Sequence, residues 1–402
     1  MKNKSVCIFG LGYIGLPTAA LLADAGFSVT GIDINQNIIK TINNCETHIV
    51  EPGLNEVLIS AIKKKNLIAQ FETVVSDIYM ICVPTPLIQE AGVNNPDLRY
   101  VENAAKEISK FIKTGDLVIL ESTSPVGTTK MIEDILLQSG LNKSEFFIAY
   151  CPERVLPGNA IKELITNDRI VGGRSNKSAK MAADFYRLFV TGEIYETNAE
   201  TAEMCKLAEN SFRDVNLAFA NELSMLSDKN GVDIWKLIEL ANKHPRVNIL
   251  QPGTGVGGHC IAVDPWFLIS KNTENSQLMK VARQVNHKKV DWVVKQIIKN
   301  TDASKLNSKI TIACLGLTFK ADIDDMRGSP ALEVYNKLRE LGYNLMCIEP
   351  NIDNVPNNAT LEEITTNADV IAVLVKHKEF LEKDVLFKLN KIETLDFCGA
   401  LS

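Results

Sequence analysis

The first half of the chain alternates between short apolar runs and stretches with a helical pattern. Apolar runs typical of buried strands cover residues 5–10, 27–33, 78–83 and 116–121, and a helical pattern covers 14–25. The two later runs end in turn-rich segments, Pro-Thr-Pro and Ser-Thr-Ser-Pro-Val-Gly. Because apolar strands that alternate with helices form parallel sheets covered on both faces, this half predicts a parallel α/β domain.

The pattern changes after about residue 198. Residues 200–300 are mostly helical in pattern, with a glycine-rich interruption at 252–258. Strand-like runs and one helical stretch then return, at 310–316, 330–341, 344–349 and 369–375. We therefore predict two α/β domains around a helical centre, divided as 1–197, 198–300 and 301–402. No Gly/Ser linker is present, so we expect the helix to hold the domains together.

Composition narrows the class of protein. The 402 residues exceed what one hydrophobic core usually fills, which agrees with several domains. The net charge of −6 argues against binding to nucleic acid. No apolar run reaches the ~20 residues of a membrane helix, and the N-terminus reads as a strand rather than a signal peptide. We expect a cytoplasmic protein that neither binds nucleic acid nor inserts into membranes.

The nine cysteines are scattered, and none forms a CxxC pair. This spacing indicates neither a zinc site nor a disulfide framework. We therefore expect no metal and reduced thiols.

A glycine-rich motif follows the first predicted strand and opens the first helix. Gly10 suits the tight turn, Gly12 lets the backbone approach a pyrophosphate, and Gly15 allows close packing of helix and strand. Asp33 closes the second strand, where a carboxylate can bind both ribose hydroxyls and would repel a 2′-phosphate. No positive charge follows it at 34–37. The motif predicts a site for NAD rather than NADP.

The geometry of such a dinucleotide site predicts four further contacts with the cofactor. Tyr13 and Ile14 are expected to offer the first helical amides to the pyrophosphate. Thr85 and Val126 follow two later strands, at the sheet edge where ligands of parallel sheets bind.

A second informative segment, 255–265, places Cys260 and Asp264 directly after three glycines. A thiolate is a strong nucleophile that can attack an aldehyde to give a thiohemiacetal. The alternative is that Cys260 is a small buried hydrophobic residue, as most of the other cysteines are expected to be. His259 is adjacent, but consecutive side chains usually point apart, so we do not expect it to act as a base.

A third segment, 201–216, has helical spacing. Lys206, Asn210 and Arg213 share one helix face. The opposite face carries Ala208, Phe212, Val215 and Phe219. This arrangement suits either a functional polar face or a core-facing apolar stripe with a solvated back.

Together these segments resemble the UDP-glucose/GDP-mannose dehydrogenase family, and the likeness covers nearly the whole chain. The motifs that carry it lie at 10–17, 122–128, 151–158, 203–216, 244–266 and 316–331. The resemblance implies two Rossmann-like domains joined by a long helix, and a homodimer formed through the middle segment. It also implies oxidation of a UDP-sugar at carbon six to a carboxylate, which takes four electrons and two NAD in succession.

The resemblance also assigns catalytic roles. It makes Cys260 the nucleophile, and it makes Lys206 and Asn210 the groups that hold the developing oxyanion. Asp264 and Thr123 match positions that orient water or act as a base. Glu153 matches a glutamate implicated in thioester hydrolysis.

Substrate contacts carry over by motif as well. Arg154 and Val155 look like the branch of the family that acts on UDP-N-acetylmannosamine, whereas UDP-N-acetylglucosamine and UDP-glucose remain alternatives. Arg246 is expected to reach the substrate of the neighbouring subunit, Gly257 to pack against the sugar, and Arg327 to lie near NAD. The remaining implied substrate contacts are Lys206, Asn210, Arg213, His244, Phe319 and Lys320.

The segment 396–402 departs from the family, which usually has a basic residue near Gly399 and a longer tail. We therefore expect this end to be truncated or divergent. Two other classes of function stay open: a two-electron dehydrogenase of the hydroxyacyl or phosphogluconate type, and a non-catalytic NAD-binding protein. Neither explains the Gly-Gly-His-Cys segment.

Overall fold

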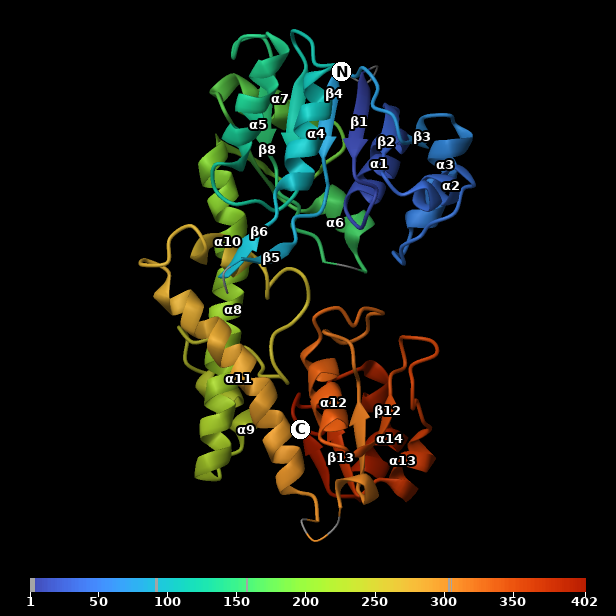
Figure 1. Ribbon diagram of the computed structural model, residues 1–402, viewed down its shortest axis with the longest axis vertical. Coiled ribbons are helices and arrows are strands. Elements are labelled where there is room, and N and C mark those ends of the chain that lie inside the picture. The colour runs from blue at the N-terminus through green and yellow to red at the C-terminus, as the bar shows by residue number, and fades with distance from the viewer. Residues whose placement is uncertain (1–3, 91–92, 157, 303, 305) are drawn as a thin grey trace. The chain divides into compact units, whose positions relative to one another are not determined.

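The computed structural model describes residues 4–90, 93–156, 158–302, 304 and 306–402. The chain folds as two compact units, Met1–Ala208 and Glu209–Ser402. In Figure 1 the first unit is coloured from blue to green and the second from yellow-green to red. The division into three domains stays a prediction.

The first unit is built on an eight-stranded sheet in the order β10-β9-β8-β7-β4-β1-β2-β3. Neighbouring strands are parallel except β8 and β9. The strands are β1 (Ser5–Phe9), β2 (Ser28–Ile32), β3 (Leu67–Gln70), β4 (Ile78–Ile81), β7 (Leu117–Leu120), β8 (Phe147–Tyr150), β9 (Arg169–Gly173) and β10 (Ile194–Asn198). A separate antiparallel pair consists of β5 (Leu87–Glu90) and β6 (Val93–Pro96).

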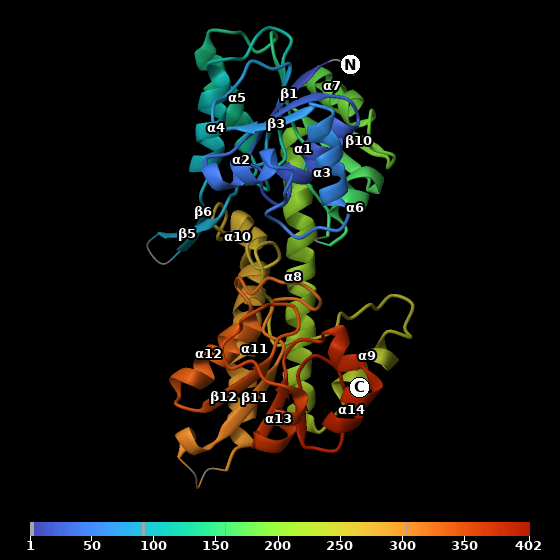
Figure 2. The ribbon, with the colours of Figure 1, turned by 90° about the vertical axis from the view of Figure 1, so that its right-hand side faces the viewer.

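Helices cover both faces of this sheet because successive strand residues point to opposite sides. Val6 and Ile8 join the core under α1 and α3, and Cys7 and Phe9 join the core under α4 and α5. Figure 2 separates these two helical layers. The helices are α1 (Gly15–Asp24), α2 (Gln36–Asn43), α3 (Leu54–Lys63), α4 (Arg99–Ser109), α5 (Thr128–Leu136), α6 (Ala160–Thr166), α7 (Asn176–Tyr186) and the start of the long α8 (Ala199–Asn230), which continues into the second unit.

The second unit contains a four-stranded parallel sheet in the order β12-β11-β13-β14. Ile312 and Cys314 pack with α11 and α12, whereas Ala313 and Leu315 pack with α13 and α14. The strands are β11 (Thr311–Leu315), β12 (Asn344–Ile348), β13 (Val370–Val373) and β14 (Thr394–Asp396). The helices are α9 (Ile234–Ala241), α10 (Asp264–Ile269), α11 (Gln277–Lys299), α12 (Pro330–Glu340), α13 (Leu361–Asn367) and α14 (Lys383–Leu389).

These units confirm the predicted fold class: two Rossmann-like sheets and a helical centre. The core-facing alternative for the apolar stripe of α8 is wrong, because Phe212 and Phe219 are 68% and 54% exposed. The side of α8 that packs on α11 is polar instead. Arg283 donates to Asp214 at 2.7 Å, and Asn221 and Asn286 share a 2.9 Å hydrogen bond. Polar pairs therefore occupy this helix contact, and the apolar stripe lies on the surface of α8.

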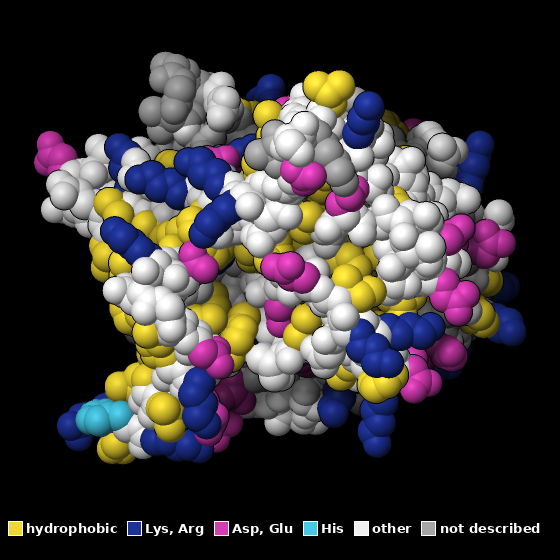
Figure 3. Space-filling model, turned by 90° about the horizontal axis from the view of Figure 1, so that it is seen from below, with side chains coloured by type: hydrophobic (Ala, Val, Ile, Leu, Met, Phe, Trp, Pro, Cys, Tyr) yellow, Lys and Arg dark blue, Asp and Glu magenta, His cyan; other side chains and the backbone are white. Residues whose placement is uncertain are grey.

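Surface charge is mixed. The face in Figure 3 carries lysine and arginine side chains interspersed with aspartate and glutamate. None of the helices in the described part of the chain combines the length and the hydropathy that crossing a bilayer requires.

Candidate active site

The turn after β1 has the geometry that the glycine motif predicts. Gly10 has φ +90°, and a Cβ there would lie 2.7 Å from the carbonyl oxygen of Cys82. A Cβ on Gly15 would lie 1.8 Å from the carbonyl oxygen of Gly10. Around Gly12, no atom lies within 4 Å of where a Cβ would be, which leaves its backbone open to a ligand. These glycines therefore fit a pyrophosphate cradle.

Asp33 completes this cradle from the end of β2. Its Oδ2 accepts the Leu11 N–H at 3.0 Å, and its Oδ1 accepts the Asn35 N–H at 2.8 Å. The half-buried carboxylate is thus fixed beside the turn and retains lone pairs for ribose hydroxyls. The residues present fit NAD.

Tyr13 and Ile14 lie slightly differently from the prediction. Helix α1 begins at Gly15, so both residues belong to the preceding turn, with Ile14 as the N-cap. The expectation that they provide the first helical amides is therefore shifted by one to two residues. The Gly12 carbonyl already accepts from the Leu16 N–H at 3.1 Å, which closes the first helical turn.

Thr85 and Thr123 come together at the same edge of the sheet. Thr85 follows β4 and donates from Oγ1 to the Thr123 carbonyl at 2.7 Å. Ser122 donates to the Val83 carbonyl at 2.7 Å, which ties the same two loops again. Val126 lies farther along the loop after β7, just before α5. A contact of Thr85 or Val126 with NAD stays a prediction.

Glu153, just after β8, belongs to a buried charge cluster. Its Oε2 accepts from Nη1 of Arg169 at 3.0 Å, and its Oε1 accepts the Arg154 N–H at 2.6 Å. The same Arg169 nitrogen lies 4.0 Å from Oε1 of Glu121. Burial raises the pKa of Glu121, and the neighbouring Glu153 raises it further, while Arg169 opposes both. The Arg169 guanidinium thus donates to one buried carboxylate, Glu153, and lies within ion-pair distance of a second, Glu121.

Lys206 meets Glu153 from α8. Its Nζ donates to the Glu153 carbonyl oxygen at 2.8 Å, so the structure brings these two predicted catalytic residues together. A pocket of about 690 Å³ in the same unit is lined by Arg154, Thr166, Asn167, Asp168, Ile170, Tyr195, Thr197, Thr201 and Cys205. Neither Lys206 nor Glu153 is among these lining residues, although each is next in sequence to one of them. Arg154 thus borders open space, while Val155 is half-buried.

A second group of predicted residues gathers in the second unit. Cys260 lies in the turn before α10, and its carbonyl accepts the Asp264 N–H at 2.8 Å. The buried Asp264 carboxylate accepts from Nδ2 of Asn210 at 2.5 Å. Cys260 is exposed, whereas the other eight cysteines are buried or only partly accessible, so the buried alternative for Cys260 is wrong. Lys206 and Asn210 lie one turn apart on α8.

The glycine-rich segment packs against the loop after β11. The hydrogen side of Gly258 faces the ring of Phe319, and a Cβ there would lie 2.8 Å from it. A Cβ on Gly257 would lie 2.2 Å from the Gly328 carbonyl oxygen. Packing within this unit therefore already requires glycine at 257, and contact of Gly257 with a sugar stays a prediction.

Arg327 and His259 are engaged with one acid. Arg327 donates to both carboxylate oxygens of Asp325, at 2.7 to 3.1 Å. His259 lies 3.9 Å from Asp325 and packs edge-on against Phe319. Burial lowers the pKa of His259, and the charge of Arg327 lowers it further. The lowered pKa keeps the imidazole neutral, so the expectation that His259 is not the base stays a prediction.

The other predicted substrate residues lie on the surface of this unit. Arg213, His244 and Arg246 are exposed. The Arg246 N–H donates to Nδ1 of His244 at 3.3 Å, which fixes their local turn. Their contacts with substrate stay predictions. Near the C-terminal end, Lys376 donates to the Gly399 carbonyl, so a basic group does lie beside Gly399.

Sequence reasoning missed Arg169 and Glu121. The Tyr186 hydroxyl donates to Oε1 of Glu121 at 2.6 Å, and the Cys82 thiol donates to Oε2 of Glu121 at 3.2 Å. The Glu121 carboxylate is therefore fully enclosed. The signal available in the sequence was an acidic residue directly after an apolar run, since Glu121 follows residues 117–120.

Comparison with known proteins identifies the family. Three models of the UDP-glucose/GDP-mannose dehydrogenase family match the chain: the NAD binding domain over residues 4–190, the central domain over 200–288 and the UDP binding domain over 313–397. The UDP-N-acetyl-D-mannosamine dehydrogenase of Campylobacter jejuni is 50% identical over 94% of this chain and 97% of its own. An NDP-N-acetyl-D-galactosaminuronic acid dehydrogenase of Ralstonia nicotianae is 46% identical over 95% and 92%.

Among solved structures, a UDP-D-ManNAc dehydrogenase from Pyrococcus horikoshii superposes with a TM-score of 0.91 at 38% identity, covering 99% of this chain and 96% of that one. Family models, relatives and the cradle at Gly10 and Asp33 point the same way. The chain therefore belongs to the UDP-glucose/GDP-mannose dehydrogenase family and is an NAD-dependent UDP-sugar dehydrogenase.

Proposed function

We propose that the chain oxidises the carbon-six alcohol of UDP-N-acetyl-D-mannosamine to the carboxylate, with Cys260 holding the intermediate aldehyde. The observation that carries the mechanism is the exposed Cys260, whose carbonyl accepts the N–H of Asp264, the residue bound by Asn210. An oxidation that stops at a carbonyl has no need of a thiol. A thiol is useful when the aldehyde must be captured and oxidised again.

NAD, when bound, supplies the hydride acceptor for both oxidations. The first removes a hydride from carbon six and a proton from its hydroxyl, which leaves an aldehyde. The Cys260 sulfur adds to the aldehyde carbon, and the oxygen takes a proton to complete the thiohemiacetal. Loss of a second hydride and proton gives a thioester, which water cleaves to the carboxylate and the free thiol.

The roles of the other residues follow from the charge that develops. The ammonium of Lys206 and the amide of Asn210 are donors suited to an oxyanion, and removing one such donor commonly costs ~10²–10³ in rate. Asp264 and Thr123 would orient water or accept its proton. Glu153 would activate water for hydrolysis of the thioester, and its hydrogen bond from Arg169 supports this role by fixing the carboxylate.

The sugar is proposed from two observations. Arg154 and Val155 match the branch of the family that acts on UDP-N-acetylmannosamine, and Arg154 lines a pocket of the first unit. The relatives from C. jejuni and P. horikoshii carry that substrate in their names. The R. nicotianae relative, at 46% identity, favours a second candidate, another N-acetylated nucleotide sugar. Contacts that distinguish such sugars contribute about 1–3 kcal/mol each.

We further propose a homodimer that works in the cytoplasm and supplies a uronic acid for cell-surface polysaccharide. The exposed side chains of Phe212, Phe219 and Leu226 recur every seven residues along α8 and support self-association of that face. Exposed apolar stripes of this kind mark interaction sites.

Turnover of the purified protein with NAD tests the proposal. UDP-N-acetylmannosamine, UDP-N-acetylglucosamine and UDP-glucose are compared side by side, and the product is identified. We expect two NADH for each UDP-N-acetylmannosamine consumed and a carboxylate product. One NADH per sugar, or release of free aldehyde, would contradict the mechanism. A higher kcat/KM with another sugar would replace the substrate.

A further inference from the structure

The two sheets of this protein share one local turn. Gly10 follows β1 with φ +90°, and its N–H donates to the Ile32 carbonyl at 2.8 Å. Gly316 follows β11 with φ +85°, and its N–H donates to the Ile348 carbonyl at 2.8 Å. Each glycine thus leaves the first strand of its sheet in the same way, against the last residue of the neighbouring strand.

The acid that follows the neighbouring strand is repeated as well. Asp33 accepts the N–H of Leu11, and Glu349 accepts the N–H of Leu317 at 2.6 Å. Each acid also accepts the amide two residues farther along, at 2.8 Å for Asp33 and at 3.1 Å for Glu349. The second sheet therefore repeats the turn and acid that the first uses for a dinucleotide.

The two acids differ in what remains available to a ligand. Asp33 is half-buried, whereas Glu349 is 1% exposed. Oε2 of Glu349 also receives the Thr318 N–H at 3.1 Å and lies 3.3 Å from Nε2 of His377. Burial alone would raise the pKa of Glu349, but the hydrogen bonds from His377 and Leu317 outweigh it and lower the pKa. This acid is charged and fully engaged, so it has no capacity left for ribose hydroxyls.

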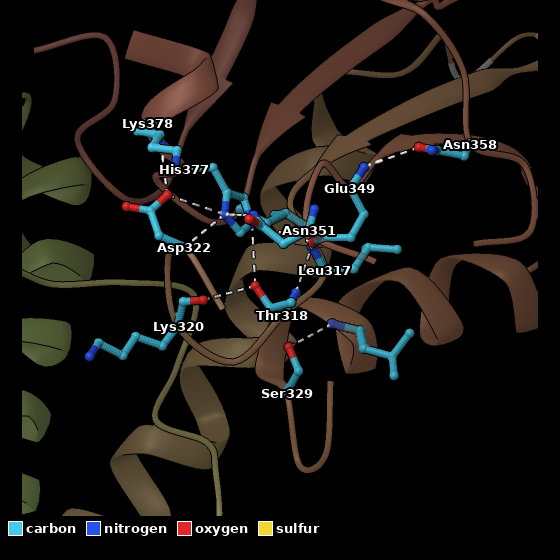
Figure 4. A network of polar contacts seen from close by, with 12 residues as sticks. Leu317, Thr318, Lys320, Asp322, Ser329, Glu349, Asn351, Asn358, His377 and Lys378 are labelled. Carbon is cyan, nitrogen blue, oxygen red and sulfur yellow. Dashed lines mark hydrogen bonds and ion pairs between the residues drawn. The ribbon is translucent and has the colours of Figure 1, made fainter. Parts of the chain in front are cut away.

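His377 is the group that encloses Glu349, and its neighbours define its tautomer. Nδ1 accepts the Asp322 N–H at 3.0 Å and faces Nδ2 of Asn351 at 2.9 Å, so this nitrogen carries no proton. Nε2 therefore bears the hydrogen and points it toward Glu349 and Thr318. Figure 4 shows the ring at the centre of this network. Because the lone pair of Nδ1 is engaged by the Asp322 N–H, the nearby carboxylates of Asp322 and Glu379 do not make this a metal site.

The ring ties together three loops at one edge of the sheet. His377 follows β13, Asn351 follows β12, and the segment 317–322 follows β11. In the order β12-β11-β13, the chain passes from β11 to β12 on one side and then crosses to β13 on the other side of β11. The topological switch point therefore lies between β11 and β13, which is where ligands of such sheets bind. The segment held by the ring contains Phe319 and Lys320. Thr318, one of the ring's neighbours, also donates to the Lys320 carbonyl at 2.8 Å.

We propose that His377 is a positioning residue for nucleotide binding in this UDP binding domain. Its ring occupies the Glu349 carboxylate, which would otherwise be able to bind ribose hydroxyls. It also fixes the loop that presents Phe319 and Lys320 to the UDP moiety. Helix α1 begins directly after the Gly10 turn, but α12 begins only at Pro330, so this loop takes the place of a helix N-terminus. The inference rests on the proposed function in taking UDP as the ligand of this loop.

Titration of UDP into the full-length protein tests the proposal, with His377→Gln compared with His377→Asn. Glutamine places its amide near Nε2 and can still donate to Glu349, but it offers no acceptor at the position of Nδ1. Asparagine places an oxygen near Nδ1 and can still accept the Asp322 N–H. We expect Kd for UDP to rise about tenfold in His377→Gln and markedly less in His377→Asn. KM for the UDP-sugar should rise with it, while kcat and Kd for NAD stay unchanged.

His287→Ala is the control, because this exposed histidine of α11 belongs to the same unit. An unchanged Kd for UDP in His377→Gln would overturn the proposal. Equal losses in both His377 variants, with NAD binding and thermal stability lost in parallel, would also overturn it by showing a purely structural role. Absence of UDP binding in the wild-type protein would instead reject the proposed function.

Discussion

Nη1 of Arg169 donates to Oε2 of Glu153 at 3.0 Å while lying 4.0 Å from Oε1 of Glu121. Nη2 of the same guanidinium donates to the Leu164 carbonyl at 3.0 Å. The planar fork of arginine thus holds one carboxylate and one backbone carbonyl at fixed angles, and all three charged side chains are buried. This geometry makes the orientation of Glu153 depend on a residue outside the pocket.

Arg169→Lys should slow hydrolysis of the thioester. Lysine keeps the charge but has no fork, so Glu153 would lose its fixed orientation, and we expect turnover to fall by at least about tenfold. A covalent acyl adduct of Cys260 should then accumulate, which intact mass spectrometry of a quenched reaction detects. Arg187→Lys is the matched control, since Arg187 forms only surface ion pairs among its described contacts. Slow turnover without an adduct would assign Arg169 to an earlier step.

Cys260→Ala should abolish formation of the uronate while leaving the ligand sites intact. Loss of a catalytic nucleophile costs at least about a thousandfold in rate. Steady-state NADH production measures this loss, and binding of UDP and NAD should remain at wild-type strength. Cys45→Ala is a suitable control because Cys45 is also partly accessible. Four-electron oxidation that persists in Cys260→Ala would reject the thiol mechanism.

Asp33→Ala should weaken NAD binding, because the ribose hydroxyls lose an ionised acceptor. Hydrogen bonds to charged groups contribute about 1.5–3 kcal/mol, so we expect Kd for NAD to rise by roughly ten- to a hundredfold. The ratio of NAD to NADP affinity should fall, since the negative charge that repels a 2′-phosphate is gone. Asp24→Ala removes an acid of the same unit that pairs with Lys64 at the surface, and it should leave both affinities unchanged.

Phe212→Glu combined with Phe219→Glu should prevent self-association. Both rings are exposed on α8, and two charges there would have to be buried in any interface formed by this face. Sedimentation velocity should show a dimer for the wild-type protein and a monomer for the double variant. Phe387→Glu changes an equally exposed ring on α14 and should stay dimeric. A double variant that remains dimeric would move the interface elsewhere.

Much of the fold could be predicted because it depends on local signals. The run that ends at Gly10, followed by the acid at Asp33, marks a strand, a turn and a second strand within one segment. The two helices that were predicted by range, 14–25 and 330–341, have boundaries within one residue of α1 and α12. The strands β3, β8, β9, β10 and β14 and the pair β5–β6 were not predicted, since each has only three to five residues, too few for a periodic pattern to stand out.

The site was less predictable where it depends on residues that meet only after folding. Glu121, Glu153 and Arg169 come from three separate segments, and nothing in their spacing shows that they share a buried contact. The stripe at Phe212 and Phe219 was predicted as a helix face, but periodicity alone does not distinguish a core from an interface. Glu349 could have been found, since it repeats the relation of Asp33 to its glycine turn.

The exposure of Cys260 makes this thiol a site for selective chemical modification. The eight other cysteines are buried or only partly accessible, and burial raises the pKa of Cys7 and of Cys151 to about 12. Soft electrophiles react with accessible thiolates and spare enclosed thiols. A mild alkylating reagent should therefore modify Cys260 before the partly accessible thiols, such as Cys45 and Cys205, and the amount modified in the earliest phase would report the accessible catalytic thiols in a preparation.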